Sequence, residues 1–204
     1  MNTSAKMSTP EYILDIRNGK YLKEAAIYKI LSECHIDSFP INVWEIARIL
    51  NFEVLEANFK DDHTSGILID ATTVPKVLEK FGTKRAIILN KKEPKNVQSF
   101  TIAHELGHFI YEANEKDNLF SAHHICKAKQ KNKFNLNERK KKNNEDQMDE
   151  FAAMLLMPEK MFKNYIRMSN NRYDKMQLAE EMAKVCMVEE EAVLRRFSEL
   201  RIKF

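Results

Sequence analysis

Apolar residues recur every three or four positions over most of this chain, which is the pattern of amphipathic helices. Three short stretches instead favour strands, because they are rich in apolar and β-branched residues and lie between turn-forming or charged segments. The expected strands are 52–55, 66–70 and 85–90, and the expected helices are 20–34, 42–50, 96–112, 145–157, one beginning after Pro158, 174–186 and 189–200. Helices, then a small sheet, then helices again predict an α+β fold that is mainly helical.

Two of these helices have recognisable beginnings. Asn42 is placed to cap the helix that follows it, and Glu45 stands three residues later, which is the spacing of a capping box. Asp174 and Gln177 have the same spacing ahead of a later helix. Within the strand at 85–90, the run Ala86-Ile87-Ile88-Leu89 is apolar enough for a central strand.

The length of 204 residues allows one domain with a small appendage. We expect a main domain at residues 1–165 and a helical, helix-turn-helix-like appendage at 166–204. No apolar run approaches the ~18 residues that a membrane span needs, and the first residues lack the apolar stretch of a secretory signal. Three scattered cysteines without an export signal predict a cytoplasmic protein with reduced thiols. The oligomeric state stays open.

Positive charge is concentrated in one segment. Residues 121–144 contain eight basic residues and one acid, a net charge of +7, while the whole chain has +3 and the remainder therefore −4. Such a block is typical of a solvated loop, and the alternative is a patch that attracts an acidic partner or nucleic acid.

The residues that indicate chemistry lie on the helix expected at 96–112. His104 and His108 are four positions apart, so both imidazoles project from one face of the helix. Two neutral imidazoles at this spacing suit Zn²⁺. Glu105 follows the first of them, where its carboxylate can accept a proton from a water activated by the metal. Gly107 lowers helix propensity by about 1 kcal/mol, which indicates a close approach by another segment. The structural alternative is a pair of core histidines bonded to backbone carbonyls.

A catalytic zinc site needs a third protein ligand. The candidate ligands are acids and histidines further along the chain: Glu145, Asp146, Asp149, His123 and His124. Glu145 and Asp149 share one face of a helix, and we prefer Glu145 as the ligand and Asp149 as the group that orients a ligand histidine. The alternative for both acids is a solvent-facing helix N-terminus. His123 and His124 are adjacent and point apart, so at most one of them could bind, and their polar surroundings favour a surface position.

Two separated motifs resemble the ImmA/IrrE metallopeptidase family. The first runs from the strand Ala86-Ile87-Ile88-Leu89-Asn90 to the segment 99–108, and the second is Phe151-Ala152-Ala153-Met154-Leu155-Leu156-Met157-Pro158. The segment Pro40-Ile41-Asn42-Val43, which leads into a helix, also resembles the N-terminal part of the family. The resemblance therefore covers roughly residues 20–160. One departure is Met148, where the family usually has Ala.

The resemblance implies a gluzincin-like, zincin-like fold with a small sheet packed on the active-site helix, and one Zn²⁺ per chain. It also implies a zinc metallo-endopeptidase that cleaves a helix-turn-helix repressor and so derepresses genes of a mobile element or a stress response. His104, His108 and Glu145 would bind the metal, Glu105 would activate water, and the substrate would add a strand to an exposed sheet edge such as 66–70. For stabilising the oxyanion, Tyr111, Tyr165, Tyr173 and one of the paired histidines stay open.

The C-terminal helices raise the question whether the protein binds DNA. Their helix-turn-helix spacing is typical of DNA readers, but the second helix would begin with Glu189-Glu190-Glu191, which repels DNA. Direct DNA binding is therefore disfavoured, and a packing or substrate-docking role is preferred. The alternative function is a non-catalytic regulatory protein that binds a repressor or DNA and carries a structural zinc.

Overall fold

The computed structural model describes residues 9–60, 64–70, 85–111, 124–127, 139–169 and 174–204. The helices in these parts are α1 (Glu11–Arg17), α2 (Lys23–Glu33), α3 (Val43–Ile49), α5 (Lys95–Tyr111), α6 (Arg139–Leu156), α7 (Glu159–Met168), α8 (Lys175–Cys186) and α9 (Glu190–Glu199). The strands are β1 (Glu53–Ala57), β2 (Thr64–Asp70), β3 (Arg85–Asn90) and β4 (His124–Lys127). The fold is α+β and mainly helical, as the pattern predicted.

The four strands form one sheet in the order β1-β3-β2-β4. β1 runs parallel to β3, whereas β2 is antiparallel to both β3 and β4. The apolar strand β3 is central, as predicted. The expectation that 66–70 offers a free edge is wrong, because β2 is paired on both sides. β4 was missed because its four residues lie inside a polar, basic stretch with no alternation of apolar positions.

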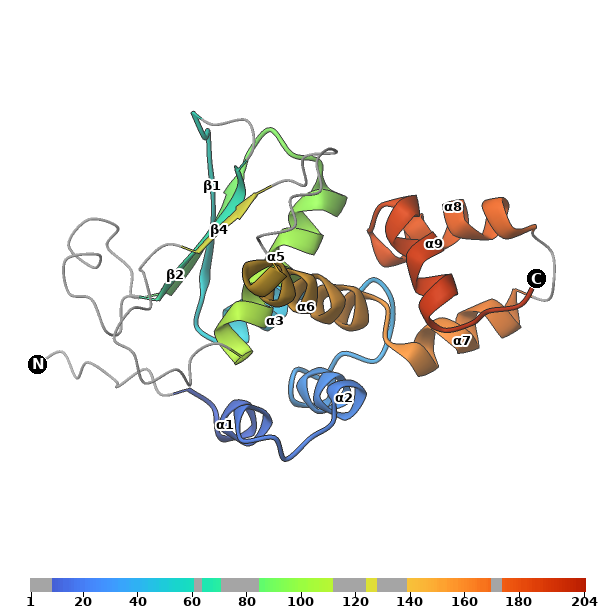
Figure 1. The fold of residues 1–204 in the computed structure, drawn as a ribbon, viewed down its shortest axis with the longest axis horizontal. Helices are drawn as coiled ribbons and strands as arrows, with labels where there is room; N and C mark the ends of the chain where they lie inside the picture. Colours follow the sequence, from blue (N-terminus) through green and yellow to red (C-terminus); the bar gives the residue numbers. More distant parts are fainter. Residues whose placement is uncertain (1–8, 61–63, 71–84, 112–123, 128–138, 170–173) are drawn as a thin grey trace, which may run out of the picture.

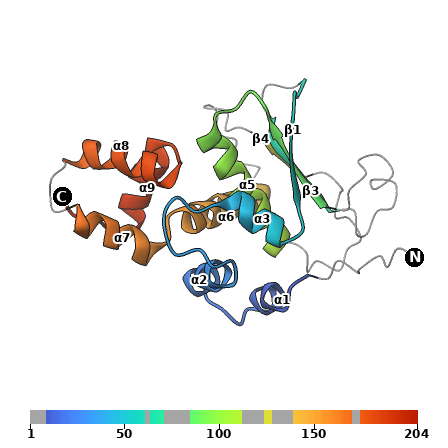
Figure 2. The same cartoon turned by 180° about the vertical axis from the view of Figure 1, so that it is seen from behind.

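Helix α5 lies between the sheet and α6, with α1 and α2 below it in Figure 1 and the sheet and α3 visible from behind in Figure 2. Gly66 of β2 lets this helix come close, since a Cβ there would lie only 2.4 Å from Thr101 Cγ2. Ten consecutive residues of α5, from 101 to 110, are buried. The helix is therefore enclosed on all sides rather than amphipathic.

Helix α6 begins earlier than expected. The basic residues 139–142 were assigned to a solvated loop, yet α6 starts at Arg139, six residues before Glu145. Lysine and arginine are good helix formers, so the charge run is compatible with a helix even though it carries no apolar stripe. α1 was also missed.

The helix caps differ in completeness. Asn42 Oδ1 accepts a hydrogen bond from the backbone N–H of Glu45 at 3.2 Å, but the Glu45 carboxylate pairs with Arg48. The box at Asp174 and Gln177 forms in both directions. The start of α8 is therefore fixed by two side chains, Asp174 and Gln177, whereas the start of α3 is capped by the Asn42 side chain alone.

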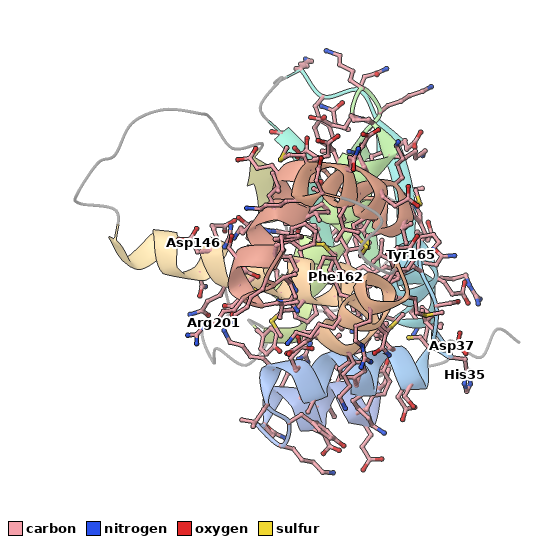
Figure 3. All side chains as sticks on the ribbon, turned by 90° about the vertical axis from the view of Figure 1, so that its right-hand side faces the viewer. His35, Asp37, Asp146, Phe162, Tyr165 and Arg201 are labelled. Carbon is pink, nitrogen blue, oxygen red and sulfur yellow. The ribbon has the colours of Figure 1, made fainter. Side chains whose placement is uncertain are left out.

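One contiguous hydrophobic core extends from α1 to α9 in the described part of the chain. Phe162 of α7, labelled among packed side chains in Figure 3, is fully buried and contacts Phe197 of α9 at a ring-centroid distance of 5.7 Å. The predicted boundary between residues 165 and 166 falls within α7 (Glu159–Met168). The division into 1–165 and 166–204 stays a prediction. No helix among the described residues is long and apolar enough to span a bilayer.

Arg196 connects the C-terminal helices to the rest of the protein. Its Nε donates to the Met157 carbonyl at 3.1 Å, and its Nη2 lies 2.8 Å from Glu24 Oε1 on α2. We expect Arg196→Ala to lower the free energy of unfolding by about 2 kcal/mol, because the Met157 carbonyl and the Glu24 carboxylate lose a mostly buried charged donor. The matched control is Arg195→Ala, which removes only an exposed i,i+4 pair and should change the free energy by less than ~0.5 kcal/mol. Urea unfolding of the two variants measures this, and equal effects would contradict the assignment.

Two of the three cysteines are buried free thiols. Burial raises the pKa of Cys34 to about 11 and that of Cys186 to about 12. Both thiols stay protonated at pH 8. Because a thiol in the unfolded chain ionises at ~8.5, burial of these neutral thiols stabilises the fold fully below that pH. This stabilisation is lost as the pH rises above it. In a Cys126→Ser background, we expect no rapid reaction with a disulfide reagent at pH 8 in the native state and two reactive thiols after denaturation. A fast native reaction would contradict this burial.

Candidate metal centre

The paired histidines lie on α5, within the stretch from 101 to 110 in which every residue is buried. His104 is 2% exposed, and Glu105 and His108 are fully buried. The i, i+4 spacing brings the two rings together at a centroid distance of 4.8 Å. Their Nε2 atoms are 3.0 Å apart.

Glu145 joins the two histidines from α6. One of its carboxylate oxygens lies 3.3 Å from His104 Nε2, and the other lies 3.7 Å from His108 Nε2. Its side chain is 47% exposed, so the cluster meets solvent at Glu145. Among the described residues, His104, His108 and Glu145 form a group whose ligand atoms all lie within 4.8 Å of one another.

The donor set suits zinc. Two ligands at ~2.0–2.1 Å from a tetrahedral ion are about 3.3 Å apart. The measured separations of 3.0, 3.3 and 3.7 Å lie around that value. Two imidazole nitrogens and a carboxylate are a set found in catalytic zinc sites, where a fourth position stays open.

Asp149 supports this arrangement one helical turn after Glu145. Its Oδ1 lies 3.0 Å from His104 Nδ1, and the residue is buried. A carboxylate at this nitrogen favours the tautomer in which Nδ1–H donates, so the Nε2 lone pair faces the cluster. The contact with His104 is the one that the role predicted for Asp149 requires, and that role stays a prediction.

Gly107 explains how α5 and α6 come close enough. A Cβ at this position would lie 2.9 Å from Phe151 Cδ1 and 3.0 Å from Met148 Sδ. The residue without a side chain therefore lets α6 bring Glu145 and Asp149 to the histidines. Met148, the departure from the family pattern, is one of the two side chains in this contact.

The other candidate residues fall outside the cluster or beyond what is described. Asp146 is exposed and projects from α6 in Figure 3. His124 begins β4, while His123 and Tyr173 lie outside the described residues. Tyr111 packs edge-on against Phe151, and the Tyr165 hydroxyl lies 3.2 Å from Glu181 Oε1. The group that would stabilise an oxyanion stays open.

Two arginines that the sequence did not single out hold the end of the histidine helix. Arg17 donates to the carbonyls of Phe109 at 2.5 Å and Ile110 at 3.1 Å. Arg85 lies over the Phe109 ring at 4.8 Å. Cations at a helix C-terminus satisfy its last carbonyls. A contact between residues 92 positions apart has no local sequence signal.

We expect Asp149→Asn to weaken zinc affinity by roughly 10–100-fold, the usual effect of removing a carboxylate that orients a ligand histidine. Competition with a chromophoric chelator measures the dissociation constant. Asp146→Asn is the matched control, because it removes an exposed carboxylate three positions earlier on the same helix. Equal zinc affinities for the two variants would contradict the role of Asp149 in orienting His104.

Comparisons with known proteins give a family match and a similar fold. The sequence profile of the Peptidase M78 family, described as the IrrE N-terminal-like domain, matches residues 47–198. A search of curated proteins finds no match. Among solved structures, a Mycobacterium tuberculosis transcriptional regulator is similar in fold, with a TM-score of 0.56 and 14% sequence identity. The match covers 93% of this chain and 52% of that one, so this chain spans about half the length of that relative.

The profile match covers most of the chain and includes both motifs on which the resemblance depended. It extends from α3 to α9, and so includes the C-terminal helices as well as the candidate metal ligands. The chain therefore belongs to the ImmA/IrrE family, the Peptidase M78 proteins with an IrrE N-terminal-like domain.

Proposed function

We propose that this protein is a zinc-dependent endopeptidase that hydrolyses a peptide bond in a helix-turn-helix transcriptional repressor. Its cleavage would derepress genes of a mobile element or a stress response in the cytoplasm. The observation that carries the proposal is the convergence of His104 Nε2, His108 Nε2 and Glu145 within 3.0–3.7 Å, beside the buried Glu105.

His104, His108 and Glu145 would hold one zinc ion. When bound, zinc supplies a Lewis acid that polarises the scissile carbonyl and lowers the pKa of water. The Asp149 carboxylate keeps the Nδ1 proton of His104 in place, which leaves Nε2 as a donor atom to the ion.

Glu105 is the general base of the proposed reaction. Its carboxylate accepts a proton from the attacking water, whose oxygen bonds to the carbonyl carbon of the substrate. The same proton then passes to the leaving nitrogen as the C–N bond breaks. Burial of Glu105 excludes bulk water from this carboxylate, so a proton released to it stays available for the leaving group.

The competing proposal is a non-catalytic protein that binds a repressor or DNA around a structural zinc. Structural zinc sites are closed by four protein ligands. The described group has three, and its third ligand, Glu145, is half-exposed, which favours a site that admits a substrate. A binding protein would also have no use for a general base at Glu105.

The C-terminal helices fit a docking role better than a DNA-reading one. Glu190 and Glu191 occupy the first turn of α9, directly after the N-cap residue Glu189. These acids favour the positive end of the helix dipole but repel phosphates. We propose that α8 and α9 pack against the catalytic part and contact the protein substrate.

The direct test is cleavage of a candidate repressor. The zinc-loaded protein is incubated with a helix-turn-helix repressor, chosen from a neighbouring gene where one encodes such a protein, and the masses of the products are measured by mass spectrometry. We expect two fragments whose masses add up to the repressor plus one water, no fragments with a chelator, and recovery after zinc is restored. Relief of repression without any fragments would favour the binding protein.

A further inference from the structure

A cavity lies beside helix α6, and none of the three candidate metal ligands lines it. Successive helical residues advance by about 100°, so the cavity face of α6 is opposite the face of Glu145 and Asp149. The cavity has a volume of about 70 Å³. Its lining comes from α2, α5 and α6 and consists of Lys23, Tyr111, Gln147, Met148, Glu150, Phe151 and Met154.

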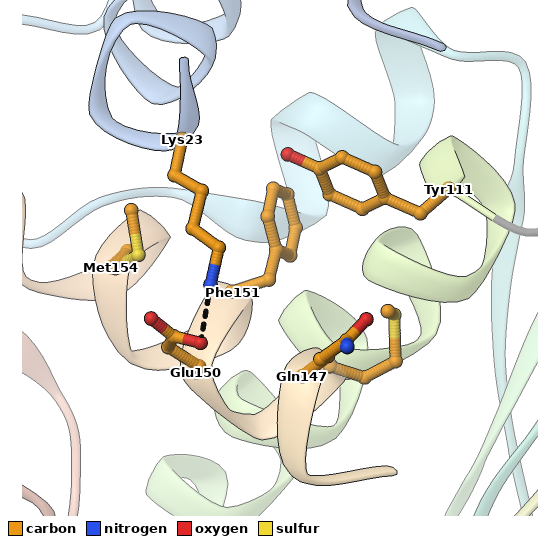
Figure 4. Close-up of a pocket in the computed structure, with 7 residues that line it drawn as sticks. Lys23, Tyr111, Gln147, Glu150, Phe151 and Met154 are labelled. Carbon is orange, nitrogen blue, oxygen red and sulfur yellow. Dashed lines mark hydrogen bonds and ion pairs between the residues drawn. The ribbon is translucent and has the colours of Figure 1, made fainter. Parts of the chain in front are cut away.

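The floor of this cavity is apolar and its mouth is polar. Met148, Phe151 and Met154 are at most 5% exposed, and the Tyr111 ring stands edge-on to Phe151 at 5.5 Å. Figure 4 shows the Lys23 stem reaching down from α2 to Glu150, with Tyr111 on the other side of Phe151 and Gln147 below it. The Lys23 ammonium and the Glu150 carboxylate are 2.6 Å apart. The mouth is therefore nearly neutral, with hydrogen-bonding groups on its rim.

The size of the cavity limits what enters it. An engineered apolar cavity of ~150 Å³ binds benzene, and this one has about half that volume. A branched group of three or four carbons fits, whereas an aromatic ring does not. The neutral rim disfavours an ionic ligand, and its amide, ammonium and carboxylate groups can bond the N–H and C=O of a peptide.

We propose that this cavity is an anchor pocket for a leucine- or valine-type side chain presented by a protein partner. Anchors of this kind bury one apolar side chain in a preformed hole while the partner's backbone stays at the polar rim. Leu22, the N-cap residue of α2 and next to Lys23 in the chain, is 85% exposed. The inference does not depend on peptidase activity, since the pocket residues are not metal ligands.

The test uses the full chain and three uncharged probes. N-acetyl-leucine amide carries the proposed side chain, N-acetyl-glycine amide carries only the backbone, and N-acetyl-phenylalanine amide carries a ring. Methyl NMR of the methionines reports binding, because Met148 and Met154 lie in the lining. We expect saturable shifts of these two methyl signals with the leucine probe. Binding of the other two should be at least ~10-fold weaker, since a buried leucine side chain contributes about that much.

A blocking variant tests the location. Gln147 is exposed at the mouth, so Gln147→Phe places a ring over it without changing the core, and should abolish the saturable shifts. Ala25→Phe is the matched control, because Ala25 is exposed on α2 but does not line the cavity. Three results would each overturn the proposal: equal binding of the glycine probe, tighter binding of the phenylalanine probe, or unchanged binding in Gln147→Phe. If the chain self-associates and the leucine probe then no longer shifts the methyl signals, a second copy of the chain would be the occupant and the proposal would be overturned.

Discussion

Replacing Glu105 by glutamine is expected to lower the rate of repressor cleavage by about 10²–10⁴-fold, the usual contribution of a general base. Glutamine keeps the shape of the side chain but cannot accept a proton from water. Because Glu105 is not proposed as a ligand, the zinc content and the thermal midpoint should stay as in the parent. The measurement is single-turnover cleavage followed by mass spectrometry, with elemental analysis of the same sample.

Glu33→Gln is the matched control for this experiment. Glu33 is exposed on α2 and pairs with Lys29, so the same chemical change there should leave the cleavage rate unaltered. If Glu105→Gln released repression as well as the parent does, the enzymatic proposal would fail and the binding protein would take its place.

Removing one histidine of the pair is the second large effect that we expect. His104→Asn or His108→Asn should reduce zinc from about one ion per chain to nearly none after gel filtration. The two remaining ligands cannot complete a tetrahedral set, and asparagine is a poor ligand for zinc. Elemental analysis measures the zinc content, and Glu145→Ala should show the same direction of change.

His35→Asn controls for the loss of any histidine. His35 is exposed and has a φ of 55°, a conformation that asparagine tolerates, so this variant should keep both its fold and its zinc. A folded parent that takes up no zinc even when zinc is supplied would contradict the site. The two histidines would then be core residues, and the binding protein would be the leading proposal.

The sheet shows where the sequence pattern was sufficient and where it was not. β3 was predicted with its observed bounds and as the central strand, because a short apolar run with β-branched residues favours a strand buried on both faces. The strand order was not predictable. The pairing of β2 with β4 joins segments about 60 residues apart, and β4 has no apolar alternation to mark it. The wrong assignment of a free edge to β2 follows directly from the missing strand.

The basic segment shows a second limit of prediction from the pattern of apolar residues. Its charge pattern predicted a solvated loop, whereas the backbone is helical from Arg139 onward. A run of charged residues has good helix propensity but no apolar spacing, so the start of α6 could not be located from periodicity.

The sequence by itself determined the local part of the candidate site. A spacing of four residues places His104 and His108 on one helix face whatever the surrounding fold is, and Glu105 directly follows the first of them in the sequence. Only the tertiary structure decided the distant part. Glu145 and Asp149 reach the histidines across about 40 residues of chain, and they do so because Gly107 lets Met148 and Phe151 of α6 pack directly on α5. Contacts of that kind depend on shape complementarity between two helices, which no single stretch of sequence specifies.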